Sequence, residues 1–391
     1  MTHDFDTPIK LRETHSMKHD MMAKYTGVTA RDALPMWVAD MDFKPPQSVL
    51  DALQAELDRG TFGYFGDDSS TRSSICDWMQ SKHGWSFEPD KIFFTHGVVA
   101  GLGITLDAFT KPGDKIVLFT PVYHAFARKI GVMERKVHEP LLELVDGEYR
   151  MDLETLQQEL TPEHKAVIFC SPHNPGGKLW SVDEITELAE FCLKNNLLLI
   201  SDEIHMDLVF PGNSHLPTAI AAPVVSRNLV TLTAASKGFN LAGGETGLII
   251  AEDKNVLAKL HSSYMRLGGT PNRFGMIMTE AAFVGGAEWS ADVRAYIMEN
   301  FRIFRDGVND IPGVSVMDMP STYLAWVDFS GTGMSQNELS KRVAETARIA
   351  TNEGKSFGTG GETFKRFNLA TPRANVIEAV TRLKDAFADL Q

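Results

Sequence analysis

Residues Thr231–Ile250 have the sequence TLTAASKGFNLAGGETGLII. An apolar, β-branched run ends in small residues and a serine, and one lysine, Lys237, follows directly. A lysine is rarely buried unless it has a partner or a chemical task, so this place at the end of a buried strand is unusual. One task that suits it is an imine bond to an aldehyde cofactor, because that bond needs an amine held still in a dry pocket.

On either side of this stretch, short apolar strands alternate with helices. Strands are predicted at 91–97, 115–121, 166–171, 197–204 and 228–236. A helix is predicted at 181–196, where Ser181 and Glu184 have the spacing of a capping box. Such alternation is typical of a mostly parallel sheet with helices on both faces, so the sequence predicts an α/β fold with a large domain at 46–284.

The two ends of the chain have a different character. Residues 1–45 are polar except around Trp37 and Phe43, and we expect an arm that packs on the small domain and the mouth of the active site. A long helical stretch is expected at 272–310. Beyond it, antiparallel strands are predicted at 322–329 and 364–370, with helices at 335–350 and 375–390. This α+β pattern predicts a smaller C-terminal domain at 285–391.

Composition narrows the classes of function. The 391 residues carry a net charge of −13, which argues against nucleic acid as a partner. The three scattered cysteines predict neither a disulfide framework nor a metal site, and they favour a reducing compartment. The N-terminal residues lack a signal-peptide core, and no apolar run has membrane-spanning length. We therefore expect a cytoplasmic protein with no membrane partner.

Polar or flexible residues follow each predicted strand of the large domain. Ligands of open α/β sheets bind beyond the carboxyl ends of the strands, so these residues should meet. Asp202 is an acid that a pyridinium nitrogen could pair with, and Tyr123 could stack on a flat ring. Each feature alone is more often structural, but together they suit one flat, phosphorylated, aldehyde-bearing ring. The set is Gly97, Val98 and Val99 at a helix start, with Tyr123, Asn174, Asp202, Ser236 and Lys237.

Several motifs resemble those of a known family. SPHNPGG (171–177), SDEIHMDLVF (201–210) and SKGFNLAGG (236–244) resemble the fold-type I aminotransferase superfamily, which uses pyridoxal 5′-phosphate. Further motifs narrow the resemblance to its MalY/PatB-like cystathionine β-lyase, or C–S lyase, branch. They are LPMWVADMDF (34–43), FGYF (62–65), PVYHAF (121–126), TYLAWVDF (322–329) and FKRFNLATPR (364–373). The resemblance extends from about residue 30 to residue 385.

The resemblance implies roles for the catalytic and ring-binding residues. Lys237 bonds to the cofactor aldehyde and later moves the α-proton of the substrate. Asp202 pairs with the pyridine nitrogen, and Tyr123 stacks on the ring and assists proton transfer. Asn174 and His205 lie at the 3′-oxygen side of the ring.

It also implies how the phosphate and the substrate are held. Tyr64 reaches the phosphate of the neighbouring subunit, which implies a homodimer with shared sites. Arg366 clamps the carboxylate of a small amino-acid substrate, a task that suits its planar fork, and Ala39 lies beside it. The alternative for Arg366 is a surface ion pair. The phosphate is held by Val98, Val99 and Ser236.

One position departs from the superfamily pattern. Many members carry an arginine eight residues after the lysine, where it helps to bind the phosphate, and the lyase branch often has a neutral residue there. Here the residue is Glu245, whose carboxylate would repel a phosphate. Either Glu245 points away from the phosphate, or another cation or a water layer lies between them, so phosphate anchoring and substrate choice are open at this position. His96 is a possible compensating donor, although an ordinary histidine at the end of a strand is the simpler interpretation.

The leading hypothesis is a carbon–sulfur β-lyase that converts cystathionine or another S-substituted cysteine to a thiol, pyruvate and ammonia. An aminotransferase is the main alternative, because both reactions begin with loss of the α-proton. A third possibility is a regulatory protein that retains the cofactor fold.

Overall fold

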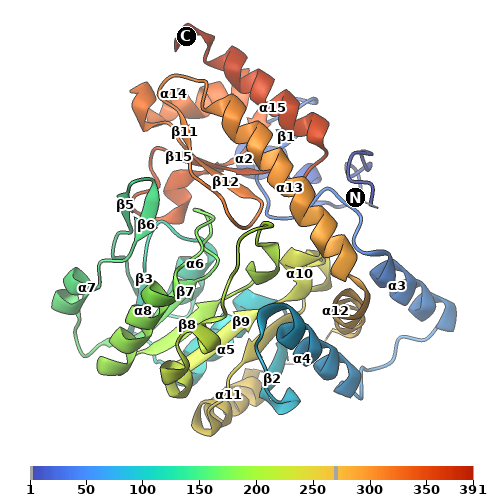
Figure 1. The fold of residues 1–391 in the computed structure, drawn as a ribbon, viewed down its shortest axis with the longest axis vertical. Helices are drawn as coiled ribbons and strands as arrows, with labels where there is room; N and C mark the ends of the chain where they lie inside the picture. Colours follow the sequence, from blue (N-terminus) through green and yellow to red (C-terminus); the bar gives the residue numbers. More distant parts are fainter. Residues whose placement is uncertain (1–2, 268–271, 391) are drawn as a thin grey trace.

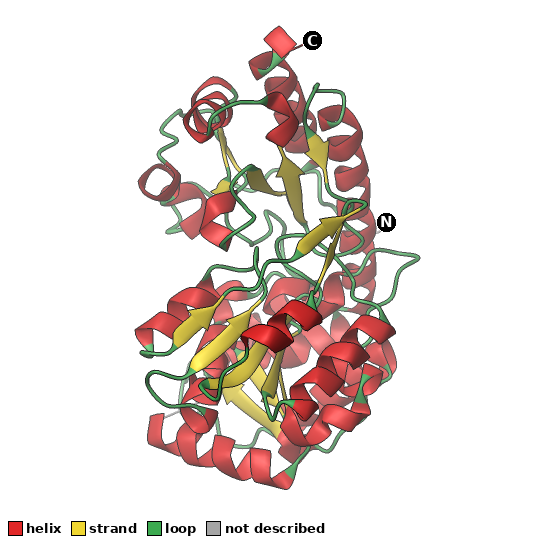
Figure 2. Cartoon of the chain, turned by 90° about the vertical axis from the view of Figure 1, so that its left-hand side faces the viewer, coloured by secondary structure: helices red, strands yellow, loops and turns green. Residues whose placement is uncertain are grey.

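Residues 3–267 and 272–390 are described by the computed structural model, and within them the chain forms two lobes, each built on its own sheet (Figure 1). One lobe holds a seven-stranded sheet flanked by helices, and the other holds a four-stranded sheet with helices beside it. Figure 2 shows the two lobes from a second direction, with helices on both sides of the larger sheet. The predicted α/β fold is confirmed.

The large sheet has the strand order β2–β10–β9–β8–β7–β3–β4. β10 runs antiparallel to both of its neighbours, and the pairs from β9 to β4 are parallel. The carboxyl ends of β2, β9, β8, β7 and β3 therefore meet at one edge of the sheet. The strand bounds are β2 Ile92–Thr95, β3 Lys115–Leu118, β4 Lys136–His138, β7 His164–Cys170, β8 Leu198–Asp202, β9 Leu229–Thr233 and β10 Gly247–Ile250.

The helices of this lobe begin and end where local signals place them. At the start of α8, the Ser181 side chain accepts the N–H of Glu184, and the Glu184 carboxylate accepts the N–H of Ser181, so the predicted capping box is confirmed. α3 ends at Gly60, which adopts φ +72°. The bounds are α3 Gln47–Arg59, α4 Ser69–His83, α5 Val98–Phe109, α6 Ala125–Val132, α7 Leu153–Glu159, α8 Val182–Lys194, α9 Thr218–Ala221, α10 Ala235–Gly238 and α11 Lys254–Leu267.

The predicted helical stretch 272–310 is two helices, α12 Arg273–Gly285 and α13 Ala287–Val308. They pack on different lobes, α12 against α3 and α4 and α13 against α15, and the break between them allows this. At the break, a Cβ on Gly286 would lie 2.7 Å from the ring of Phe239. Glycine is therefore needed where the chain changes direction.

The small lobe contains the antiparallel sheet β11–β12–β15–β14. The predicted helix 335–350 is shorter here: α14 ends at Lys341, and a π-helical turn follows. Ile349–Ala350 then forms β13, which pairs with β1, Leu34–Pro35, of the N-terminal arm, so tertiary pairing overrides local helix propensity. The other bounds are β11 Ser315–Val316, β12 Leu324–Asp328, β14 Asn352–Glu353, β15 Phe364–Asn368, α14 Gln336–Lys341 and α15 Arg373–Ala386.

The arm segment 36–43 lies between the two lobes. The Asn240 side chain, from the large lobe, bonds the backbone of Met41 and the carbonyl of Phe43. Asn368, from β15, donates to the carbonyls on either side of Ala39, each at 2.6 Å. The Ala39 carbonyl is thereby held in place. Other short elements are α1 Met17–Asp20, α2 Met22–Thr26 and the hairpin β5 Glu143–Val145 with β6 Glu148–Arg150. The domain boundaries at 45 and 284 stay predictions.

Within the described part of the chain, no helix is both long and apolar enough to cross a membrane.

Candidate active site

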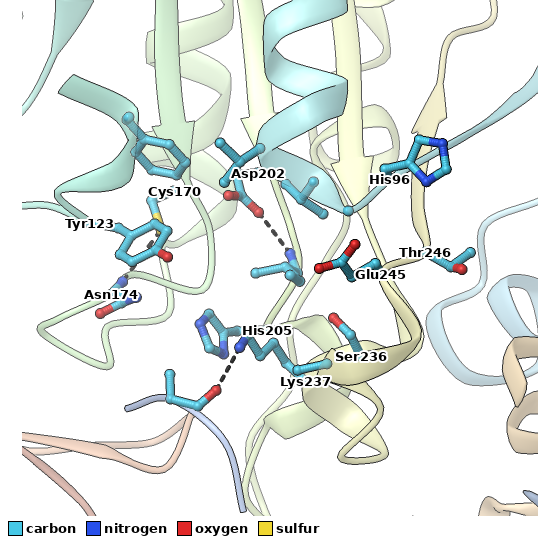
Figure 3. Close-up of a pocket in the computed structure, with 17 residues that line it drawn as sticks. His96, Tyr123, Cys170, Asn174, Asp202, His205, Ser236, Lys237, Glu245 and Thr246 are labelled. Carbon is cyan, nitrogen blue, oxygen red and sulfur yellow. Dashed lines mark hydrogen bonds between the residues drawn. The ribbon is translucent and has the colours of Figure 1, made fainter. Parts of the chain in front are cut away.

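A cavity of about 430 Å³ lies beyond the carboxyl ends of β2, β3, β7, β8 and β9 (Figure 3). The sheet topology explains why residues far apart in the sequence meet there. Most of the predicted site residues line this cavity, and their individual roles stay predictions. These residues are Ala39, Val98, Val99, Tyr123, Asn174, Asp202, His205, Ser236 and Lys237.

Lys237 lies on α10, directly after β9, and its Nζ donates a hydrogen bond of 2.5 Å to the carbonyl of Ala39 (Figure 3). Burial lowers the pKa of Lys237 to about 8, with Asp40 acting in the opposite direction. A useful fraction of the amine is therefore neutral near neutral pH, which a nucleophilic lysine requires. Gly238 lets this turn pack closely, because a Cβ there would lie 2.8 Å from Asp207 Cβ.

Asp202 ends β8 and is 3% exposed. Among the described residues, the N–H of Ile204, at 3.0 Å, is its carboxylate's hydrogen-bond donor, and no salt bridge reaches it. Burial raises the pKa of Asp202 to about 7. The neighbouring His205 is also buried, which lowers its pKa to about 3, and its Nδ1 has no partner within the described residues. Within the described residues, the cavity thus holds a buried acid with no charged partner and a buried neutral imidazole whose Nδ1 has no hydrogen-bond partner.

The start of α5 presents backbone N–H groups to the cavity. Gly97 adopts φ +80° and precedes the helix, so the N–H groups of Val98 and Val99 lie in its first turn, where no helical acceptor is available. β10 packs closely here through Gly247, whose Cβ would lie 2.7 Å from the nitrogen of Val98. Ser236 lines the same cavity. The helix dipole adds a partial positive charge at this end.

Arg366 lies on β15 and is 2% exposed, so the alternative of a surface ion pair is wrong. Its guanidinium donates to Asn174 Oδ1 at 2.8 Å, to Asn352 Oδ1 at 2.7 Å and to the carbonyl of Trp37 at 3.1 Å. No carboxylate within the described residues pairs with it, and its Nε has no partner there. Burial lowers the pKa of Arg366 to about 10. Arg366 contacts the cavity through Asn174.

Tyr123 follows β3, and its ring packs edge-on against Phe126, with the ring centroids 5.5 Å apart. Burial raises the pKa of its hydroxyl. Tyr64 is different: it is 97% exposed and does not line the cavity. The expectation that it serves a neighbouring subunit stays a prediction.

Several residues at the site were not predicted. The Tyr323 hydroxyl donates to the same Ala39 carbonyl as Lys237, at 3.0 Å, and Asp40 is an acid close enough to affect the pKa of Lys237. Tyr323 and Asp40 both belong to motifs that mark the family resemblance. Their membership of those motifs was the sequence signal that could have identified them. Cys170 and Thr246 also line the cavity. His96, the possible compensating donor, lines it as well, as an exposed residue, and its role stays a prediction.

Glu245 lines the cavity as well, and Figure 3 shows its carboxylate pointing inward. The possibility that this residue turns away from the site is therefore excluded for this structure.

Comparisons with known proteins place this geometry in context. A family model described as aminotransferase class I and II matches residues 32–383. The chain is 38% identical to cystathionine β-lyase PatB of Bacillus subtilis, over 98% of this chain and 100% of that protein. It is similar in structure to cystalysin from Treponema denticola, which contains pyridoxal 5′-phosphate, with 34% identity, a TM-score of 0.95 and 100% coverage of both chains. It is also similar to a pyridoxal-phosphate-bound C–S lyase from Staphylococcus hominis, with 29% identity, a TM-score of 0.91 and coverage of 99% and 98%.

Proposed function

Because the chain belongs to the aminotransferase class I and II family, we propose that it is a pyridoxal-phosphate-dependent C–S β-lyase. Its substrate is cystathionine or another S-substituted L-cysteine, and its products are a thiol, pyruvate and ammonia. The proposal is carried by one observation: the chain is similar from end to end to a cystathionine β-lyase, and its Lys237 and Asp202 line the same cavity.

The unpartnered groups of the cavity fit this cofactor. Asp202 would hold the ring nitrogen, because it is a buried acid with a single N–H donor among the described residues. His205 Nδ1 is a free polar atom beside the ring site. The first turn of α5 and Ser236 would hold the phosphate, and Lys237 would hold the aldehyde. The bound cofactor supplies an electron sink that stabilises negative charge at the α-carbon of the substrate.

The protein's own residues account for the rest of the chemistry. Lys237 Nζ, with its pKa of about 8, accepts the α-proton at Nζ and can return it to a leaving group. Arg366 holds the substrate carboxylate, which gives its buried charge the anionic partner that the described residues do not provide. Lys237 Nζ donates a hydrogen bond to the Ala39 carbonyl, and this bond keeps the amine in place.

Release of pyruvate without any keto acid tests the proposal. The purified protein, loaded with pyridoxal phosphate, should form pyruvate and a thiol from cystathionine or S-alkyl cysteines. Turnover that requires a keto acid, with accumulation of the pyridoxamine form, would instead identify an aminotransferase. A protein that turns over neither kind of substrate, yet produces a phenotype that survives replacement of Lys237 by alanine, would be a regulator.

The chain is also proposed to act as a homodimer in which Tyr64 serves the neighbouring phosphate site. Supporting this, Tyr64 is 97% exposed, and the nearby Phe62 and Leu57 are 56% and 57% exposed, an apolar group that a second subunit could cover. A mixture of Y64A and K237A chains tests the shared site. Mixed dimers with one intact site should regain part of the activity, whereas each variant alone should have little.

The cytoplasm is the proposed location, since Cys76, Cys170 and Cys192 are all free thiols, as a reducing compartment would keep them.

A further inference from the structure

Glu245 is an acid at the anion-binding end of the cavity. Figure 3 shows its carboxylate on the side of the cavity that holds Ser236, opposite Asn174 and Tyr123. Arg366 contacts Asn174, so the expected carboxylate site of the substrate lies toward the other end. Glu245 therefore faces the place where the phosphate of the cofactor would lie, rather than the place where the substrate would bind.

The direction of this side chain is set by its backbone. Glu245 adopts φ +43°, a left-handed conformation that is uncommon for residues other than glycine, and its N–H bonds the carbonyl of Ala242 at 3.2 Å. The preceding carbonyl, of Gly244, accepts bonds from Thr246 Oγ1 and Asn272 Nδ2. Gly244 itself has no room for a Cβ, which would lie 2.4 Å from Met278 Cε. The backbone before and after Glu245 is thus held by these bonds, which sets the direction in which its side chain leaves the loop.

The carboxylate has no compensating charge. Within the described residues it forms no hydrogen bond and no salt bridge. Among the described residues lining the cavity, Lys237 is the one lysine or arginine, and its amine would be committed to the aldehyde. Within the described residues of one chain, the attraction for a phosphate therefore comes from the N–H groups of α5 and from Ser236, and Glu245 opposes it.

We propose that Glu245 repels the phosphate of the cofactor and thereby makes the cofactor exchangeable. The inference rests on the proposed function. The protein holds pyridoxal phosphate less tightly than the rest of its cavity would allow, so the loaded fraction follows the concentration of free cofactor. The repulsion also grows with pH, because the phosphate gains its second negative charge near pH 6.

The charged and titratable groups around Glu245 do not cancel this effect. His96 faces the cavity from the loop between β2 and α5, and Lys237 faces it from α10. Asp202, from β8, and Tyr123, from the loop after β3, also line it. These groups are the same in the wild type and in a Glu245 variant. A ratio of affinities between the two proteins therefore isolates the contribution of Glu245 at each pH.

Titration of the cofactor-free protein with pyridoxal phosphate, followed by its visible absorbance, tests the proposal. E245Q should bind about tenfold more tightly at pH 7.5, and this ratio should shrink toward pH 5.5 as the phosphate loses charge. E245R, which adds a cation, should bind more tightly still. Pyridoxal, which lacks the phosphate, should bind the wild type and E245Q equally.

A matched control is E134Q, because Glu134 is also an exposed glutamate with a left-handed backbone, φ +62°, but lies outside the cavity. E134Q should bind both probes as the wild type does, and thermal melts of the cofactor-free proteins should show that all variants fold. Equal or weaker binding of pyridoxal phosphate by E245Q, or an equal gain for pyridoxal, would overturn the inference. A wild type that develops no absorbance band with pyridoxal phosphate would instead contradict the proposed function.

Discussion

Asp202 and Glu203 are adjacent acids, both almost fully buried, yet their surroundings are opposite. Glu203 points into the core, where it accepts bonds from Ser201 Oγ and the N–H of Thr218 and pairs with His215 Nε2 at 2.9 Å. Asp202 points into the cavity and has the N–H of Ile204 as its donor within the described chain. Successive residues of an extended chain face opposite sides, so one neighbour serves the core and the other faces the ligand.

Two neighbouring cations on β15, Lys365 and Arg366, also differ in their surroundings. Lys365 is 1% exposed and pairs with Glu353 at 2.6 Å, whereas Arg366, at 2%, meets neutral oxygens in the described chain. The arm adds a third case: Lys18 is fully buried and pairs with Asp42 at 2.9 Å, whereas Lys237 donates to the Ala39 carbonyl. Within the described residues, the buried charges in the core thus have charged partners, whereas the charged groups at the cavity have neutral hydrogen-bond partners.

The largest difference is expected between Lys237 and Lys18. K237A should lower turnover by more than about 10³-fold, because it removes the amine that holds the cofactor and moves the proton, and it should leave the melting temperature nearly unchanged. K18M should leave Asp42 buried with only His19 as a partner and cost about 3–5 kcal/mol of stability. Steady-state assays and denaturant titrations measure both. If K237A and K18M lowered the free energy of unfolding equally, the distinction between the two lysines would be wrong.

Substitutions of the two adjacent acids, Asp202 and Glu203, should likewise differ in their effects on turnover and stability. D202N should lower kcat by about 10²-fold or more, because a neutral amide holds a ring nitrogen's proton poorly, while stability stays constant or rises. E203Q should destabilise the fold by about 1–3 kcal/mol, because it weakens the bond between Glu203 and His215, and it should change kcat little. The comparison fails if E203Q, corrected for its folded fraction, loses as much turnover as D202N.

The pair on β15 should differ in substrate binding. R366K should raise KM by about tenfold or more, since lysine cannot offer two parallel N–H groups to a carboxylate. K365M should leave KM unchanged and cost about 1 kcal/mol at most, because the Glu353 side chain is 36% exposed and stays hydrated when its partner is removed. A rise in KM for K365M would show that the whole strand end, rather than Arg366, positions the substrate.

A further difference concerns the pH dependence of stability without cofactor. The pKa of Asp202 is raised to about 7, so the folded protein keeps a proton that the unfolded chain releases near pH 4. The contribution of Asp202 to stability therefore falls as pH rises from about 4 to 7, by about 1–3 kcal/mol. D202N should remove this slope. Chemical denaturation of the wild type and D202N at pH 5 and pH 7.5 measures it.

Much of the fold could be predicted because its signals are local. The apolar strands, the capping box at Ser181 and the residues that follow each strand are all legible in the sequence, and sheet topology then explains why they meet. The break at Gly286 and the strand Ile349–Ala350 were missed, because packing of α12 and α13 on different lobes and pairing with the arm decide them. Neither interaction leaves a local pattern.

The sequence by itself determined the α/β class, the lysine at the end of β9 and the order of the groups at the strand ends, since these depend on periodicity and on neighbours in the chain. Tertiary structure alone decided which charges lack partners. Arg366 differs from Lys365, and Asp202 from Glu203, only through residues distant in sequence that approach one and not the other. It also decided that Glu245 points inward, because a left-handed backbone locked between Ala242 and Asn272 directs it there.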